Sequence, residues 1–219
     1  MSELLEIILH TDDALLAIAE ANHIKAYFVL FLIIFCETGL IVTPFLPGDG
    51  LLFSAGVVAA ATQLNLGLMI ILLVLAAILG NIVNFAVGKY FGDRLEESPN
   101  RFVQKYLVKY IVQTRGFYEK HGGKSIILGR FFPIIRTYIP FFAGVADFPW
   151  KTFLIYTFIG AATWVPIFSL VGYFAGEIPW VKDNYGVIFM LLVILPFLSL
   201  FIGIAKETLG KFFPRKKAA

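Results

Sequence analysis

Two arginines lie inside an otherwise apolar stretch of the chain, GRFFPIIRTYIPFFAG, which contains Arg130 and Arg136. An arginine at bilayer depth costs at least about 2.5–3.5 kcal/mol on insertion scales, so each of the two needs a partner. A second apolar stretch, ETGLIVTPFLPGDGLLFSAG, carries Glu37 and Asp49 instead. We expect the basic stretch to face the acidic stretch and to form a polar site within an apolar protein.

The spacing of the two arginines indicates that the chain bends between them. Arg130 and Arg136 are six residues apart, which on a continuous helix places them roughly 120° away from a common face. Pro133 lies midway and removes a helical hydrogen bond, which would let the two guanidinium groups converge. Converging arginines suit a phosphate, because each guanidinium offers a planar fork of donors.

The two carboxylates call for a similar bend. Glu37 and Asp49 are twelve residues apart, about 18 Å along a straight helix, and a turn between Pro44 and Gly48 would bring them together. Burial favours the protonated form of a carboxylate and a nearby arginine favours the ionised form. That balance suits a proton-coupled step, and a purely structural ion-pair network is the alternative interpretation.

The composition places these charges in a membrane protein. The chain has 219 residues, of which 59% are hydrophobic and 15% are charged, whereas soluble domains are about 45–50% apolar and about 25% charged. We therefore expect an all-α polytopic membrane protein with a single membrane domain over residues 1–219.

The acidic stretch lies in a long apolar region, Ala26–Ala61, with a break in its middle. Each arm of roughly 15 residues reaches about 22 Å, which is short of a hydrocarbon core of roughly 30 Å. We expect two re-entrant helix-turn-helix hairpins, with two tilted spanning helices as the alternative for Ala26–Ala61. The predicted hinge and turn residues are Pro44, Pro47, Gly48, Pro133, Pro140 and Gly144.

Three uninterrupted apolar runs predict about three spanning helices, over residues 66–87, 153–175 and 185–205. Asn81 and Asn84 lie within the first run, and we expect them to donate hydrogen bonds between helices. Amphipathic surface helices are predicted near the N-terminus and after Pro99, where basic and aromatic residues interleave. The second of these helices should end near His121, which we interpret as a helix-end residue.

The sequence also contains an internal repeat. The order Phe-Leu-Pro, Ala-Gly, Gly-Lys-Tyr-Phe-Gly in the first half returns as Phe-Phe-Pro, Ala-Gly, Gly-Tyr-Phe-Ala-Gly in the second. We place repeat one at about 1–92 and repeat two at about 98–176, followed by the last spanning helix and a basic tail, 206–219. The copies should end on opposite sides of the membrane, and inverted repeats of broken helices are typical of transporters.

Basic residues predict the orientation. Eight lysines and arginines crowd the loop after the first spanning helix, and the C-terminal tail is also basic. The positive-inside rule therefore places the middle loop and the C-terminus in the cytoplasm.

The acidic stretch and the pattern YEKHGGKSIILGRFFPIIRTYIPFFAG resemble those of the DedA family of bacterial inner-membrane proteins (the VTT or SNARE-associated type), over nearly the whole chain. The resemblance implies two opposed re-entrant hairpins and proton-motive-force-dependent transport, with recycling of undecaprenyl phosphate for cell-envelope synthesis. The essential acidic pair of the family falls on Glu37 and Asp49. Its essential arginine pair falls on Arg130 and Arg136.

A lipid-phosphate flippase is thus the expected function, with a phosphate lipid, protons and membrane lipids as partners. A proton-coupled exporter of small cations or drugs, a lipid scramblase and a membrane assembly protein are the alternatives. We expect no enzyme, cofactor, metal site or nucleic-acid partner, because the sequence shows no nucleophile paired with an acid/base group and no metal-ligand cluster. A homo-oligomer is left open.

Overall fold

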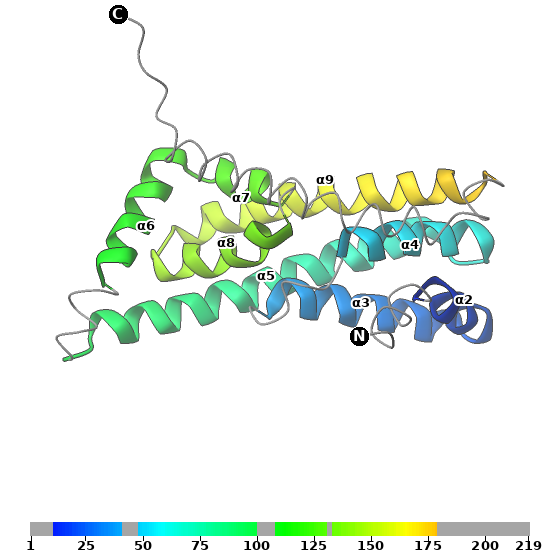
Figure 1. Cartoon of the computed structure of the whole chain (residues 1–219), viewed down its shortest axis with the longest axis horizontal. Helices are drawn as coiled ribbons and strands as arrows, with labels where there is room; N and C mark the ends of the chain where they lie inside the picture. The colour runs from blue at the N-terminus through cyan, green and yellow to red at the C-terminus, as the bar shows by residue number, and fades with distance from the viewer. Residues whose placement is uncertain (1–10, 41–47, 100–107, 131–132, 179–219) are drawn as a thin grey trace, which may run out of the picture.

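The computed structural model describes residues 11–40, 48–99, 108–130 and 133–178, and every regular element in these ranges is a helix. The predicted last helix, the basic tail, Pro44 and Pro47 lie outside the described residues. The helices are α2 (Thr11–Ala21), α3 (His23–Gly39), α4 (Gly48–Ala61), α5 (Leu66–Glu96), α6 (Val108–His121), α7 (Lys124–Gly129), α8 (Pro133–Val145) and α9 (Trp150–Gly176) (Figure 1).

Helices α5 and α9 run along the length of the molecule (Figure 1). Both are long and apolar enough to cross a membrane, over Leu66–Arg94 and Trp150–Gly176. At 1.5 Å per residue they reach about 46 Å and about 40 Å, more than a hydrocarbon core of roughly 30 Å. Helix α5 continues past the predicted end of its apolar run at residue 87 and includes the more polar residues up to Glu96.

The other helices near the centre are shorter. Helix α3 has 17 residues, α4 has 14 and α8 has 13, so they reach only about 20–25 Å each. Gly48 is the first residue of α4 and Pro133 the first residue of α8, where a missing N–H costs no helical hydrogen bond.

The structure corrects the predicted turn at Pro140 and Gly144, because both residues lie within α8. Pro140 removes a single N–H donor and leaves the Arg136 carbonyl without its helical partner. Membrane helices tolerate such an interruption when neighbouring groups satisfy the freed backbone.

The two most extensive helix contacts are crossings of a short helix on a long one: α4 packs on α9, and α8 packs on α5. A Cβ atom at Gly56 would lie 2.1 Å from the Ser169 carbonyl oxygen, and one at Gly144 would lie 2.1 Å from the Phe85 carbonyl oxygen. Glycine is therefore needed at both positions, since any side chain would push the paired backbones apart.

The two crossings also share their register. Gly144 lies 88 positions after Gly56, and the residues they touch, Ser169 and Phe85, differ by 84. The reciprocal contacts obey the same offsets, because Gly172 of α9 meets the Phe53 carbonyl while Gly88 of α5 meets the Phe141 carbonyl. Each short helix thus packs on the long helix from the other half of the sequence.

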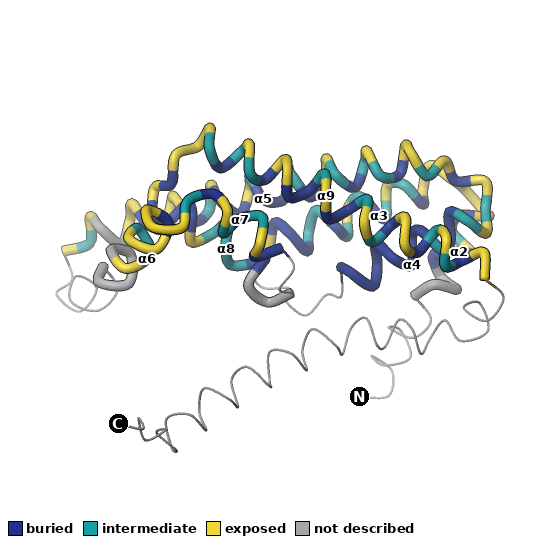
Figure 2. Tube along the Cα trace, turned by 90° about the horizontal axis from the view of Figure 1, so that it is seen from above, coloured by how far each residue is buried: buried dark blue, intermediate teal, exposed yellow. Residues whose placement is uncertain are grey.

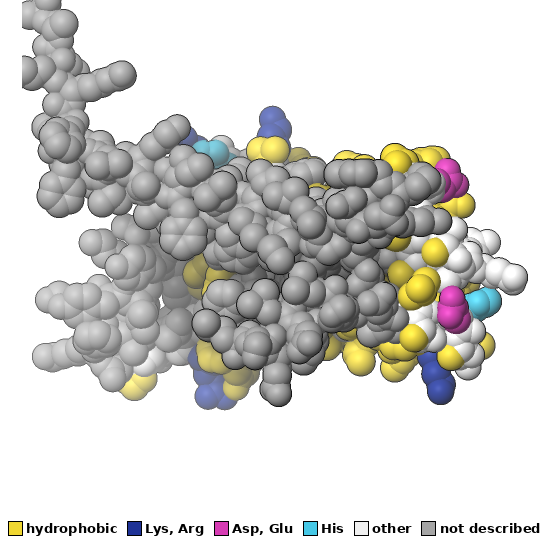
Figure 3. All heavy atoms as spheres, turned by 45° about the vertical axis from the view of Figure 1, so that its right-hand side comes forward, with side chains coloured by type: hydrophobic (Ala, Val, Ile, Leu, Met, Phe, Trp, Pro, Cys, Tyr) yellow, Lys and Arg dark blue, Asp and Glu magenta, His cyan; other side chains and the backbone are white. Residues whose placement is uncertain are grey.

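Large apolar side chains are exposed on the outer faces of the long helices. On α5 they recur every three or four positions, which defines one helix face (Leu68, Ile71, Leu75, Leu79 and Val83). Exposed and buried positions alternate along the same helices in Figure 2, and the part of the surface coloured by type in Figure 3 is largely hydrophobic. An apolar face of this length fits lipid, so the chain is a membrane protein.

Helix α6 lies across one end of the molecule and is fastened to α8 (Figure 1). The buried Tyr118 hydroxyl donates to the Ile139 carbonyl at 2.7 Å, and burial raises the pKa of this hydroxyl. As predicted, α6 ends at His121, whose Nδ1 lies 3.0 Å from the Phe117 carbonyl oxygen, and Gly122 follows with φ of 60°.

Candidate functional site

A buried ion-pair cluster lies where the acidic and basic stretches meet. Arg136 of α8 donates from Nη1 to Asp49 Oδ1 at 2.5 Å and from Nη2 to Glu37 Oε1. One guanidinium therefore binds both carboxylates, each by a separate prong of its donor fork. All three residues are at most 9% exposed, so these are ion pairs removed from water.

The three side chains meet because each lies near the end of a helix. Glu37 lies in the last turn of α3, Asp49 in the first turn of α4 and Arg136 in the first turn of α8. Both carboxylates are thus close to the N-terminus of α4, where the helix dipole favours negative charge. A Cβ atom at Gly48 would lie 1.9 Å from Glu37 Oε2, so only glycine allows this approach.

Arg130 has a different environment from Arg136. It caps the C-terminus of α7, and its Nη2 donates to the Thr157 carbonyl of α9 at 3.3 Å. Among the described residues no carboxylate lies within ion-pair distance of it, although it is only 5% exposed. Gly160 makes room for this side chain, because a Cβ atom there would lie 2.7 Å from Arg130 Nε.

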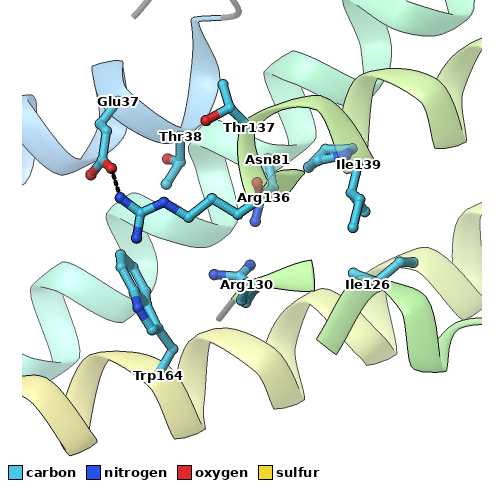
Figure 4. A pocket seen from close by; sticks show the side chains of 10 residues that line it. Glu37, Thr38, Asn81, Ile126, Arg130, Arg136, Thr137, Ile139 and Trp164 are labelled. Carbon is cyan, nitrogen blue, oxygen red and sulfur yellow. Dashed lines mark hydrogen bonds and ion pairs between the residues drawn. The ribbon is translucent and has the colours of Figure 1, made fainter. Parts of the chain in front are cut away.

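Trp164 of α9 completes the cluster, although it was not among the predicted site residues. Its Nε1 donates to Asp49 Oδ1 at 2.8 Å, and the Arg136 guanidinium carbon lies 4.9 Å from its ring centroid. In Figure 4 the Arg136 side chain reaches past this indole toward Glu37. The sequence feature that could have indicated this role is a tryptophan in the middle of a predicted spanning helix. The N–H of a buried indole needs a hydrogen-bond acceptor.

Asn84 of α5 ties the acidic and basic arms together. Its Nδ2 donates to the Thr38 carbonyl of α3 at 3.1 Å and to the Thr137 carbonyl of α8 at 2.8 Å. This confirms that Asn84 donates hydrogen bonds between helices. Because Thr38 follows Glu37 and Thr137 follows Arg136, the amide fixes the distance between the two ion-pair partners.

A small cavity of about 10 Å³ adjoins the cluster, lined by Glu37, Thr38, Asn81, Ile126, Arg130, Arg136, Thr137, Ile139, Pro140 and Trp164. Both arginines reach it, from α7 and from α8 (Figure 4). A volume of this size admits about one water molecule. A phosphate group is several times larger, so the cavity must widen before a phosphate could bind between the two arginines.

Comparison with known proteins identifies relatives over most of the chain. The VTT domain family matches residues 46–174. The chain is 44% identical over 206 residues to "Protein DedA" of Escherichia coli, which covers 93% of both chains. It is 33% identical over 183 residues to "Inner membrane protein YqjA" of the same species, covering 82% of this chain and 80% of that one.

A third relative is described only as an uncharacterized membrane protein of Mycobacterium tuberculosis. It is 34% identical over 180 residues, which cover 81% of this chain and 78% of the relative. No solved structure matches the chain significantly.

Proposed function

This chain belongs to the DedA family of VTT-domain membrane proteins, and we propose that it uses the proton-motive force to flip a polyprenyl phosphate across the bacterial cytoplasmic membrane. Undecaprenyl phosphate is the proposed substrate, and its recycling for cell-envelope synthesis is the proposed purpose. The prenyl tail would remain in the bilayer beside the apolar faces of α5 and α9. Only the head group then needs a polar path.

The observation that carries this proposal is the unequal neutralisation of two buried arginines. Arg136 is bound to two carboxylates, whereas Arg130 donates only to a backbone carbonyl among the described contacts. A buried cation without an anion is costly. A phosphate bound at Arg130 would supply that anion, and it would lie beside the donor fork of Arg136.

Proton coupling follows from competition for Arg136. The guanidinium cannot donate the same N–H groups both to the carboxylates and to a phosphate. Protonation removes the negative charge of a carboxylate and weakens its hold on Arg136. Arg136 could then turn to the phosphate, and loss of the proton would return it to the carboxylate and release the lipid.

The helix lengths support the re-entrant architecture that such a site needs. Helices α3, α4 and α8 are each too short to cross a hydrocarbon core alone, and the two crossings repeat one register at fixed offsets. We propose two opposed hairpins in an inverted repeat, with the middle loop and the C-terminus in the cytoplasm. Irregular backbone at depth would be acceptable in such hairpins where protein surrounds it.

Export of a small cation has less support. A cation entering the cluster would have to displace Arg136 from both carboxylates, and Arg130 would repel it. An enzymatic role would require a nucleophile and a general base within hydrogen-bond reach. We propose a transporter that has no enzymatic activity.

Flipping can be measured directly in liposomes that contain the protein and a labelled polyprenyl phosphate, with and without an imposed proton gradient. We expect gradient-dependent movement that Arg130→Lys reduces about 10-fold or more, because lysine lacks the planar fork. The matched control is Arg94→Lys, at an exposed position on α5. Wild-type flipping by Arg130→Lys would contradict the phosphate role.

A further inference from the structure

We propose that Trp164 holds Asp49 in its ionised form, so that Glu37 is the carboxyl group that takes up the coupling proton. The inference rests on the proposed proton coupling at this site. It assigns different roles to two acidic residues that resemble each other in burial and share one arginine.

The hydrogen bonds distinguish the two carboxylates. Asp49 Oδ1 accepts from Arg136 Nη1 at 2.5 Å and from Trp164 Nε1 at 2.8 Å. Glu37 Oε1 accepts only from Arg136, and its buried Oε2 lies against the Gly48 backbone without a hydrogen bond of ordinary geometry to any described group. Donors aimed at a carboxylate stabilise its ionised form, so the Trp164 N–H, which reaches Asp49 and not Glu37, favours charge on Asp49.

A protonated carboxyl group would also fit better at Glu37. A carboxylic acid must place its proton on one oxygen, and Asp49 Oδ1 already receives two N–H donors. Oε2 of Glu37 receives no side-chain donor among the described residues and faces the Gly48 backbone, so a proton on it displaces no N–H of Arg136 or Trp164. Protonation at this atom leaves the Arg136–Asp49–Trp164 contacts intact.

The other neighbours do not reverse this distinction. Arg136 of α8 contacts both carboxylates, and the N-terminus of α4 is close to both. Arg130, which caps α7, lines the same cavity as Glu37, and α5 contributes the uncharged Asn81 to it. From α9 only Trp164 approaches the cavity, and it donates to Asp49.

Trp164 also limits the movement of Arg136. The guanidinium lies over the indole ring, a cation–π contact that holds it near Asp49. When Glu37 is protonated, Arg136 can release Glu37 and turn one prong toward the cavity while the other stays on Asp49. Trp164 is therefore a positioning residue, which acts on the proton through Asp49 and on the phosphate through Arg136.

Infrared difference spectroscopy tests this assignment, because a protonated carboxyl group has its own C=O band. The full chain would be titrated with acid in lipid nanodiscs, without substrate. We expect a buried carboxyl band that Glu37→Gln abolishes. Asp49→Asn should keep the band and move it to lower pH, since Arg136 then faces a single carboxylate. A band that Asp49→Asn abolishes and Glu37→Gln retains would overturn the proposal.

The Trp164→Phe variant tests the cause, because it keeps a ring beneath Arg136 and removes the N–H. We expect a second titrating carboxyl band, which disappears when Asp49→Asn is added. Trp150→Phe is the matched control on the same helix, outside the cluster, and should give the wild-type spectrum. A wild-type spectrum from folded Trp164→Phe would overturn the role of the indole.

These spectra are independent of the transported substrate. If Trp164→Phe does not yield folded protein, the Glu37→Gln and Asp49→Asn spectra still decide which carboxyl group binds the proton. A failed flipping assay with normal spectra would reject the lipid substrate and leave the assignment in place. Reversed spectra with normal flipping would reject the assignment alone.

Discussion

The α4–α9 and α8–α5 crossings share one backbone register and carry different side chains. By the 88-residue offset, Gly48 and Asp49 of α4 correspond to Arg136 and Thr137 of α8. The acidic group of one half therefore faces the basic group of the other half. The glycine contacts set the position of α4 and α8 on the long helices. The opposite charges of Asp49 and Arg136 then make the N-terminal ends of α4 and α8 attract each other.

The long helices differ in the same way. By the 84-residue offset, Trp164 of α9 corresponds to Gly80 of α5. Gly80 lets α3 approach, because a Cβ atom there would lie 2.0 Å from Thr38 Oγ1, whereas Trp164 at the corresponding position is buried and donates to Asp49. Two helix contacts of the same register thus hold one asymmetric site.

Removing the shared cation should break this arrangement most strongly. Arg136→Gln leaves two buried carboxylates without a counter-ion, and we expect a loss of about 3–5 kcal/mol of stability. Protonation would neutralise the abandoned carboxylates, so the loss should shrink as the pH falls. Thermal unfolding in detergent at mildly alkaline and mildly acidic pH would measure it, and an equal loss at both pH values would contradict the ion-pair account.

The shared register can be tested with matched glycine substitutions. Gly56→Ala and Gly144→Ala each place a methyl group against a backbone carbonyl, and we expect each to cost about 1–3 kcal/mol. Gly116→Ala in α6 is the control, because a Cβ atom there meets nothing within 4 Å. If only one of the two crossings is sensitive, the crossings are not equivalent.

Removing the hydrogen bonds of Asn84 between α3 and α8 should reduce stability less. Asn84→Leu keeps the side-chain size and removes the donor to the Thr38 and Thr137 carbonyls. Both carbonyls belong to helices, so we expect a loss of only about 1–2 kcal/mol. A larger fall in flipping than in stability would indicate that Asn84 sets the distance between Glu37 and Arg136, and unchanged stability would show that the tie contributes nothing.

The smallest effect is expected at the exposed end of the α8–α5 crossing. Lys89 forms an ion pair with Asp147 at 2.8 Å, and both side chains are at least half exposed. By the same offset α9 carries Tyr173 at this position. Because water screens exposed pairs, Lys89→Met should leave the unfolding temperature within replicate scatter; a clear decrease would mean that the second crossing depends on this pair.

The charged residues of the site could be predicted because they are rare in their surroundings. Glu37, Asp49, Arg130 and Arg136 each interrupt an apolar stretch, and a buried charge has few acceptable environments. Their separate contacts could not be predicted, since spacing along a chain does not show which arginine meets which carboxylate. Trp164 escaped notice because an indole in an apolar helix is ordinarily part of the core.

The helices themselves were predictable from apolar run length, but their partners were not. The repeat indicated two equivalent halves, yet nothing in its spacing shows that α4 packs on α9 and not on the long helix of its own half. Pro140 was predicted to lie in a turn and lies within α8, because proline ends helices of soluble proteins more reliably than it ends membrane helices. Gly144 looked like a turn residue and is a site of close helix contact.

Proton uptake on lipid binding tests the central claim most directly. Calorimetric titration of the detergent-solubilised chain with a short-chain prenyl phosphate, repeated in buffers of different ionisation enthalpy, gives the net number of protons taken up. If a proton and a phosphate exchange places around Arg136, binding should take up protons in the wild type, and Glu37→Gln should remove that uptake. If the wild type and Glu37→Gln bind the phosphate with the same net proton uptake, the exchange of a proton and a phosphate around Arg136 is contradicted.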